Sequence, residues 1–226
     1  RVISPTENIN DKLVFSNILR PLKLEDYVWQ DSIKKHLSVS INSSKIRWET
    51  LDHILFYWPP WLWKTTISNI IAHEMESNLK STSGPAIEKQ SDLVSILSNL
   101  EEWDILFIDE IHRLRPQVEE ILYTAMEDFE IDIMVWSGTW AQSVKLPLKR
   151  FCLIWATTRL SALSNPLRDR FWNILKLDFY SSDELSKIIH NNSFKLDLSL
   201  SNYALDSISK KSRWTPRISN RLLKII

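Results

Sequence analysis

Glycine is almost absent from this chain, and tryptophan is abundant. Two of the 226 residues are glycine and 11 are tryptophan. A globular chain of this length carries roughly 16 glycines, because glycine makes up about 7% of residues on average. The 2 glycines and 11 tryptophans together number 13, close to that expectation. Because glycine alone adopts positive φ angles without steric cost, the positions of the tryptophans constrain which turns the chain can form.

The tryptophans lie at segment ends and beside turn-forming residues, and none completes the apolar face of a helix. We therefore hypothesise that the gene uses UGA as a glycine codon and that UGA is read here as tryptophan. Gly84 and Gly138 would then come from ordinary GGN codons. Outside residues 58–65, the positions that fit this hypothesis are Trp29, Trp48, Trp103, Trp136, Trp140, Trp155, Trp172 and Trp214.

The remaining three tryptophans fall in a segment with the spacing of a phosphate-binding loop. Residues 58–65 have the sequence WPPWLWKT and lie between an apolar run and an amphipathic segment. With glycine at Trp58, Trp61 and Trp63 the segment becomes GPPGLGKT, which matches the motif G-x-x-x-x-G-K-[ST]. The motif needs glycine because its backbone N–H groups must approach the phosphates closely. An aromatic or polyproline surface patch is the other interpretation of these residues.

Short apolar runs alternate with amphipathic segments, which is typical of a parallel sheet covered by helices. The apolar runs predict strands at residues 54–57, 105–108, 151–154 and 174–179, and the sequence loosens between them, at residues 131–146, into a pattern typical of a hairpin. From Ser181 onward the pattern is helical, with Ser182 and Asp183 as candidate caps. We place a domain boundary near Tyr180.

Charge and cysteine content exclude several classes of protein. Lys and Arg together number 28, as do Asp and Glu, so no net field points to nucleic acid or a membrane surface. The single cysteine, Cys152, cannot form an internal disulfide, and no apolar stretch approaches the roughly 18 residues of a membrane span. The first ten residues are polar, unlike a signal peptide. We expect a soluble cytoplasmic protein without membrane contact.

Two acidic residues end the second apolar run. Asp109 and Glu110 follow residues 105–108, and Asp109 lies 45 residues beyond Lys64. In nucleotide hydrolases with a phosphate-binding loop, an acid at this point holds Mg²⁺ together with the loop Ser or Thr, here Thr65. Glu110 is placed to act as the general base toward water. Alone, such a pair equally fits a solvated strand end, but together with Lys64 and Thr65 it predicts a nucleotide-hydrolysing site.

Two further segments allow two interpretations each. Residues 155–159 put hydroxyl groups at the end of a strand, where ligands bind in open parallel sheets, although a threonine-rich turn also fits. Residues 168–171 have the sequence RDRF, which fits a salt-bridged helix end. The same residues fit an arginine finger aimed at a neighbour's γ-phosphate, because guanidinium binds phosphate in a bidentate manner.

With glycine at the tryptophan positions, the chain from about residue 19 to residue 226 resembles the RuvB family, the AAA+ motors of bacterial Holliday-junction branch migration. The strings IDEIHRL at 108–114 and RWTPR at 213–217 separate it from other AAA+ proteins such as clamp-loader subunits, which remain the alternative family. The other motifs that carry the resemblance are LRP at 19–21, LDH at 51–53, the loop at 58–65, SGP at 83–85, EDF at 127–129, WATTR at 155–159 and PLRDRFW at 166–172.

The resemblance implies an α/β fold, in which a P-loop AAA+ parallel sheet flanked by helices is followed by the start of a small helical lid domain. Residues 1–180 would form the large ATPase domain and 181–226 a truncated lid, without the family's C-terminal winged-helix DNA-binding domain. The implied catalytic residues are Lys64, Asp109, Glu110, Thr158 (or its neighbour Thr157), Arg170 and Arg217. The implied nucleotide-binding residues are Leu19, Arg20, Trp58, Trp61, Trp63, Lys64, Thr65, Thr66, Glu127, Asp128, Phe129, Tyr180 and Arg217, with Thr65 and Asp109 binding the metal.

The resemblance also implies a function in DNA recombination and repair. The protein would use ATP and Mg²⁺ to drive branch migration as a homohexamer on double-stranded DNA at Holliday junctions. A hairpin near residues 131–148 would bind a RuvA-type partner through apolar residues such as Ile131, Ile133, Met134 and Val135, although an ordinary sheet hairpin also fits. For the chain as written, with indoles in the loop, the alternative is a tryptophan-rich module that binds no nucleotide.

Overall fold

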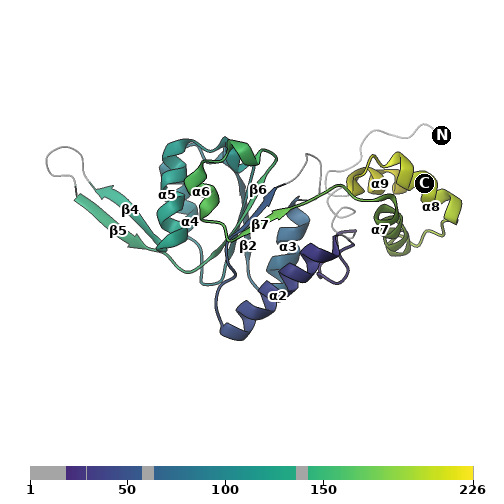
Figure 1. Cartoon of the computed structure of the whole chain (residues 1–226), viewed down its shortest axis with the longest axis horizontal. Helices are drawn as coiled ribbons and strands as arrows, with labels where there is room; N and C mark the ends of the chain where they lie inside the picture. The colour runs from purple at the N-terminus through teal and green to yellow at the C-terminus, as the bar shows by residue number, and fades with distance from the viewer. Residues whose placement is uncertain (1–18, 29, 58–63, 136–141, 226) are drawn as a thin grey trace. The chain divides into compact units, whose positions relative to one another are not determined.

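The computed structural model describes residues 19–28, 30–57, 64–135 and 142–225 (Figure 1). They form two compact units. One unit contains the central sheet and its helices, and the other joins the described residues before Gln30 to the segment that begins at Phe179. The short segment that ends at Thr66 is grouped with the second unit, although helix α3 (Lys64–Met75) continues into the first.

The first unit is built on a five-stranded parallel sheet, which confirms the predicted fold class. Its central strands are near-continuous apolar runs because both faces of the sheet are covered. In the order β2-β3-β6-β1-β7, strand β6 separates β1 from β3, so the carboxyl ends of these three strands lie along one edge. The strands are β1 (Ile54–Tyr57), β2 (Leu79–Ser83), β3 (Ile105–Asp109), β6 (Cys152–Thr157) and β7 (Asn173–Lys176).

Helices cover both faces of this sheet. Figure 1 shows α2 (Asp31–Arg47) and α3 on one side, and α4 (Gln90–Ser98) and α5 (Pro116–Glu127) on the other. Alternate strand residues point to opposite faces. The face toward α4 and α5 forms one buried apolar cluster, so α5 rests on a rigid support. The cluster includes Leu55, Leu93, Leu97, Leu106, Ile108, Val118, Leu122, Leu153 and Trp155.

The predicted hairpin is confirmed as a separate two-stranded antiparallel sheet. Strands β4 (Glu130–Val135) and β5 (Gln142–Pro147) pair with each other and extend away from the end of α5 (Figure 1). At the base of the hairpin Ile131 is buried in the core and Ile133 packs against it. The Lys145 ammonium pairs with the Glu130 carboxylate at 2.8 Å. The connecting residues 136–141 lie outside the described ranges.

The strand boundaries differ from the sequence prediction in three places. Strand β2 was missed because its sequence, LKSTS, contains one apolar residue and forms a half-buried edge. Strand β6 continues to Thr157, so Trp155 lies inside the strand rather than at its end; pairing with β1 and β3 on both sides supports this extension. Strand β7 ends at Lys176 rather than residue 179 because its partner β1 ends opposite it, at Tyr57.

The second unit contains three helices, α7 (Ser182–Lys195), α8 (Asn202–Lys211) and α9 (Pro216–Leu223), around a small core of Ile189, Ile208 and Leu223. The cap of α7 is Ser181 rather than Ser182 or Asp183. Its hydroxyl accepts from the Glu184 amide at 3.1 Å, and the Glu184 carboxylate accepts from the Ser181 amide at 2.7 Å. This reciprocal pair is a capping box. No helix in the described ranges has the length and apolarity needed to cross a membrane.

Candidate functional site

The two predicted carboxylates lie at the carboxyl end of β3. Asp109 is the last residue of the strand and its Oδ1 accepts from the Glu110 amide at 2.9 Å. Glu110 has a φ of 52°, which turns the chain into the short helix η2 (Ile111–Arg113). The Glu110 carboxylate pairs with Arg113 Nη1 at 3.1 Å and keeps about 40% of its side-chain surface exposed. The first carboxylate is thus oriented by the backbone, while the second remains open to solvent.

One of the two glycines packs directly against this turn. A Cβ atom on Gly84 would lie 2.5 Å from the Glu110 carbonyl oxygen. A backbone oxygen cannot move aside as a flexible side chain can, so only glycine allows the helix η1 (Gly84–Ala86) to approach the acidic pair. The position of Glu110 therefore depends on the absence of a side chain at residue 84.

The end of β6 separates the two threonines that the sequence left as alternatives. Thr157 is fully buried; its hydroxyl accepts from the Arg159 amide at 3.0 Å and contacts His112 Nδ1 at 3.2 Å. It therefore joins β6 to η2. Thr158, the next residue, is half-buried. The burial and bonding of Thr157 favour Thr158 as the residue available to a ligand.

The strand before the phosphate-binding loop and the helix after it are both present. Strand β1 ends at Tyr57 and α3 begins at Lys64. In general, the first N–H groups of a helix have no partner within the helix and can bind anions. Thr65 is exposed and Thr66 is buried. Trp58, Trp61 and Trp63 lie outside the described residues.

Three of the five described tryptophans have left-handed backbone conformations. The φ angles are 54° at Trp48, 74° at Trp103 and 63° at Trp214. Trp172 lies in a bend and is 91% exposed. Trp155 does not fit the expected turn setting. It is fully buried in β6 against Phe171, with ring centroids 4.6 Å apart, and its Nε1 has no hydrogen-bond partner among the described residues.

Arg170 and Glu127, both predicted site residues, are in contact. Arg170 follows the short helix α6 (Asn165–Asp169), and its Nη2 lies 2.9 Å from Glu127 Oε2 at the end of α5. Asp128 is exposed beside Glu127. Phe129 has a φ of 53° and packs at right angles to the Phe151 ring, 5.7 Å between centroids.

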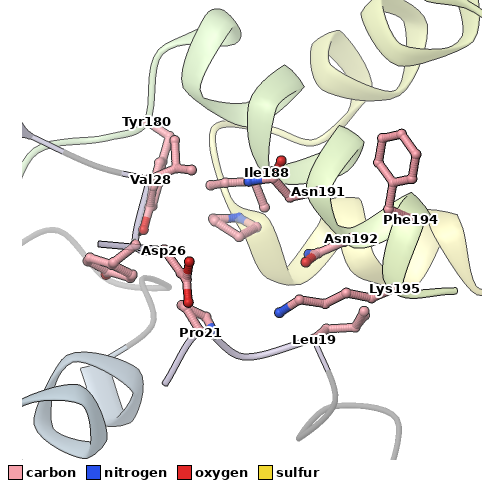
Figure 2. A pocket seen from close by; sticks show the side chains of 12 residues that line it. Leu19, Pro21, Asp26, Val28, Tyr180, Ile188, Asn191, Asn192, Phe194 and Lys195 are labelled. Carbon is pink, nitrogen blue, oxygen red and sulfur yellow. Dashed lines mark hydrogen bonds between the residues drawn. The ribbon is translucent and has the colours of Figure 1, made fainter. Parts of the chain in front are cut away.

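The second unit contains a cavity of about 390 Å³ between the segment at residues 19–28 and helix α7. Figure 2 shows Lys195 and Asn192 extending from α7 into the opening, opposite Leu19 and Asp26. Two predicted site residues, Leu19 and Tyr180, line it, and the Tyr180 hydroxyl donates to the Tyr27 hydroxyl at 3.2 Å. The volume and mixed lining are typical of a small-molecule site. The complete lining is Leu19, Pro21, Asp26, Tyr27, Val28, Tyr180, Ile188, Asn191, Asn192, Phe194, Lys195 and Pro216.

Two arginines flank residues of this lining and lie close enough to interact. Burial lowers the pKa of the Arg20 guanidinium, and the positive charge of Arg217 lowers that pKa further. An anion near Arg20 would favour its charged form. Burial also raises the pKa of Tyr27 and Tyr180, so both hydroxyls stay protonated and neutral.

Sequence reasoning missed Tyr27, Asn192 and Lys195, which line the cavity beside the predicted residues. Their types and spacing carry no motif. They come together because the segment at residues 19–28 folds against α7. The sequence of neither segment predicts that contact.

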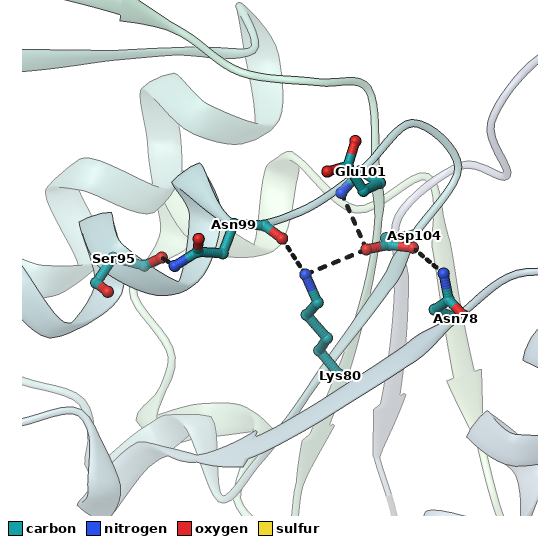
Figure 3. A network of polar contacts seen from close by, with 6 residues as sticks. All are labelled: Asn78, Lys80, Ser95, Asn99, Glu101 and Asp104. Carbon is teal, nitrogen blue, oxygen red and sulfur yellow. Dashed lines mark hydrogen bonds and ion pairs between the residues drawn. The ribbon is translucent and has the colours of Figure 1, made fainter.

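At the amino ends of β2 and β3, charged side chains form a structural network. Figure 3 shows Asp104, buried just before β3, with the Asn78 amide at 3.1 Å, the Glu101 backbone N–H at 2.9 Å and the Lys80 ammonium at 3.3 Å. Lys80 also donates to the Asn99 carbonyl at the end of α4. A buried charge with this many partners is stable in place. This network fixes the amino ends of β2 and β3, at the edge of the sheet away from Asp109 and Glu110.

Two family models match nearly the whole described chain. Residues 19–177 match the Holliday junction DNA helicase RuvB P-loop domain, and residues 180–226 match the RuvB AAA lid domain. The Holliday junction branch migration complex subunit RuvB of Sulfurimonas denitrificans is 57% identical over 206 residues, which are 91% of this chain and 61% of the relative. The RuvB subunit of Rickettsia africae is 52% identical over 225 residues, which are 100% of this chain and 65% of the relative.

Solved structures agree with these matches. The RuvB Holliday junction branch migration motor of Thermotoga maritima has a TM-score of 0.82 at 45% identity, covering 92% of this chain and 64% of that one. The chain thus spans less than two thirds of the length of these relatives. Its parallel sheet, its acidic strand end and both family models lead to one conclusion: the chain belongs to the RuvB family.

Proposed function

We propose that the full-length protein is an ATP-hydrolysing motor that drives branch migration at Holliday junctions, working as a homohexamer with a RuvA-type partner. One observation carries the proposal: Asp109 and Glu110 end β3 along the edge where β1 leads through the loop to Lys64 and Thr65. In open parallel sheets, ligands bind at this edge. Membership of the RuvB family, whose model describes a P-loop domain, supports a nucleoside triphosphate as the ligand.

The phosphates would be held by the start of α3. Lys64 supplies positive charge, Thr65 and Thr66 supply hydroxyl groups, and loop positions 58, 61 and 63 supply backbone N–H groups. Thr65 and Asp109 provide the hard oxygen ligands that Mg²⁺ prefers, and the backbone bond that orients Asp109 suits a ligand role. When bound, Mg²⁺ offsets the negative charge of the phosphates.

Hydrolysis needs a group that accepts a proton from water, and Glu110 suits this role. Its carboxylate is partly exposed and its charge is supported by Arg113. Water would attack the γ-phosphorus as its proton passes to Glu110, and the bond to the β-phosphate oxygen breaks. Thr158 would contact the γ-phosphate from the same subunit, and Arg170 would contact that of the neighbouring subunit.

The base and sugar of the nucleotide would occupy the cavity of the second unit. Leu19 and Tyr180 line that cavity, and Arg20 and Arg217 carry the charges next to it. Arg217 would respond to the γ-phosphate from the lid, which we place after a boundary near Tyr180. Glu127, Asp128 and Phe129 would lie near the nucleotide of an adjacent subunit.

The partner surface and the DNA contact are further parts of the proposal. The β4–β5 hairpin would bind the RuvA-type partner, with its base held by Ile131 in the core. DNA would be contacted mainly through phosphates and without sequence preference, by a domain beyond residue 226. We place the protein in the cytoplasm.

We also propose that the native polypeptide carries glycine at the 11 tryptophan positions. The left-handed φ angles at Trp48, Trp103 and Trp214 support this, because glycine adopts such angles without cost. The codons test it: UGA triplets at these positions are expected, and UGG triplets would exclude it. Peptide mass spectrometry of the protein from its own host provides an independent measurement.

The first experiment tests the phosphate site. Full-length protein with glycine at the 11 positions is expected to hydrolyse ATP, and Lys64→Ala to abolish turnover because the phosphates lose their nearest cation. Steady-state phosphate release measures this. Undiminished turnover in Lys64→Ala would refute the site. Stimulation by junction DNA together with a RuvA-type partner separates a branch-migration motor from a clamp-loader subunit, which would not respond to them.

A further inference from the structure

Helix α5 lies next to α6 in Figure 1, and its sequence carries three polar residues spaced one turn apart. They are Glu119, Tyr123 and Glu127, at positions i, i+4 and i+8, and we call them the polar ladder of α5. Helix α6 has only five residues, Asn165–Asp169. A helix this short has little stability of its own, so its position depends on its neighbours.

Glu119 and Tyr123, the N-terminal part of the ladder, contact the residue that begins α6. The Tyr123 hydroxyl lies 2.7 Å from Ser164 Oγ and 3.2 Å from Glu119 Oε2, and Ser164 Oγ lies 3.4 Å from the same carboxylate. Ser164 is the N-cap residue of α6, yet its side chain accepts no capping bond from α6 in this structure. The hydroxyl that would ordinarily cap α6 instead joins it to α5.

Tyr123 and Glu127, the C-terminal part of the ladder, contact the residue that follows α6. Arg170 Nη2 lies 2.9 Å from Glu127 Oε2, and the Arg170 guanidinium carbon lies 4.9 Å from the centre of the Tyr123 ring. Tyr123 therefore contacts both ends of α6, through its hydroxyl at Ser164 and through its ring at Arg170. The Arg170 side chain retains about 30% exposure, which leaves it accessible at the surface.

We propose that Tyr123 and Glu127 are positioning residues for Arg170: they hold its guanidinium in the orientation in which it meets the γ-phosphate of the neighbouring subunit. The inference rests on the proposed function, and it gives Glu127 a role that acts through Arg170. An arginine side chain has several rotatable bonds, and fixing them before the reaction removes a cost from the transition state. The aromatic face of Tyr123 and the contact with Glu127 restrict the rotation of the guanidinium.

The test uses full-length protein with glycine at the 11 positions. Tyr123→Leu and Glu127→Gln are made in the parent and in an Arg170→Ala background. In the parent, each is expected to lower kcat roughly tenfold and to change KM for ATP less than about twofold, because binding does not involve the finger. In the Arg170→Ala background neither is expected to lower kcat further, since their effect passes through Arg170. Tyr123→Phe, which keeps the ring, is expected to retain more activity than Tyr123→Leu.

Glu120→Gln is the matched control, because Glu120 is exposed on the same helix and the same chemical change is made. It is expected to leave kcat at the parent value, and circular dichroism confirms that each variant is folded. An equal loss of kcat with and without Arg170 would overturn the proposal, as would a rise in KM at unchanged kcat. A parent without turnover, or an Arg170→Ala variant as active as the parent, would instead refute the proposed function and this inference with it.

Discussion

Left-handed backbone angles at Trp48, Trp103 and Trp214 place a large side chain where the chain turns most sharply. An L-residue in this conformation brings its Cβ close to the following carbonyl oxygen, at a cost of roughly 1–2 kcal/mol. At Trp48 the indole has 84% of its surface exposed, so burial does not offset the cost. The backbone at these three positions has the conformation that glycine adopts most readily.

Replacing each of these three tryptophans by glycine should stabilise the fold. We expect a gain of about 0.5–1 kcal/mol for Trp48→Gly, Trp103→Gly or Trp214→Gly, once the greater entropy of glycine in the unfolded chain is subtracted. Urea unfolding measures the gain. Trp172→Gly is the control, matched most closely to Trp48, because Trp172 is 91% exposed against 84% for Trp48 and has no positive φ. A uniform gain or loss at all four positions would show that the backbone angle is not the cause.

His53 makes folding stability depend on pH. Its Nδ1 accepts from the Leu153 amide at 3.0 Å, so its Nε2 carries the proton and donates to the Met126 carbonyl at 3.1 Å. Burial lowers the pKa of the imidazole, and the bond to Met126 and the charge of Asp52 offset this only in part. The unfolded chain therefore binds a proton first as the pH falls below about 6.5. Stability is complete above that pH and declines below it.

The glutamine variant isolates this dependence. An amide at residue 53 presents the same donor and acceptor without titrating. Between pH 7.5 and 5.5 the parent is expected to lose about 1 kcal/mol more unfolding free energy than His53→Gln. Urea denaturation at both pH values measures the difference. Equal losses in the two proteins would mean that His53 is not the titrating group.

Among single residues, those with a local signature were predictable and those placed by folding were not. Asp109 and Glu110 follow an apolar run and stand at a fixed distance from Lys64, so their setting was visible in the sequence. Tyr27 and Lys195 reach the cavity from distant segments without a shared motif. Trp155 was expected in a turn and lies in the core, because the strand continues past the last aliphatic residue.

At the level of elements, burial on both faces made strands easy to predict. Strands β1 and β3 are continuous apolar runs and were found with nearly correct bounds. Strand β2 lies at an edge of the sheet and pairs with one strand, β3. Its side chains are only partly buried, so its sequence can be polar. Strand β7 ends where its partner β1 ends. The sequence of residues 177–179 therefore cannot predict this boundary.

The contact between η1 and the turn after β3 predicts the effect of a single methyl group. Gly84→Ala would place a Cβ 2.5 Å from the Glu110 carbonyl oxygen, so the acidic turn must shift. We expect a loss of about 1–3 kcal/mol of stability, as for other overpacked sites, together with lower ATP turnover at unchanged KM. Ala86→Ser, which adds an atom at an exposed position of the same element, is the control. Wild-type kcat in Gly84→Ala would show that Glu110 tolerates the shift.

At the level of the whole molecule, the candidate nucleotide residues are divided between two compact units. The sheet unit supplies the acids, Thr158 and Arg170, and the helical unit supplies the cavity with Leu19, Tyr180 and the adjoining arginines. The residues that each unit contributes could also have a purely structural role. The nucleotide binding that we propose would need residues from both units, so a ligand-binding measurement tests that proposal for the whole chain.

A bound nucleotide should stabilise the glycine-containing protein and leave the chain as written unchanged. At a Mg·ATP concentration about 100 times the dissociation constant, linkage predicts about 2.7 kcal/mol of stabilisation, visible as a higher melting temperature. The decisive variant carries glycine at the eight positions outside the loop and tryptophan at 58, 61 and 63. It should gain the stability that glycine gives to the turns. We expect indoles in the loop to exclude the phosphates, so Mg·ATP should not shift the melting temperature of this variant. A shift in this variant would mean that the loop binds phosphate without glycine, and the assignment of the loop would fail.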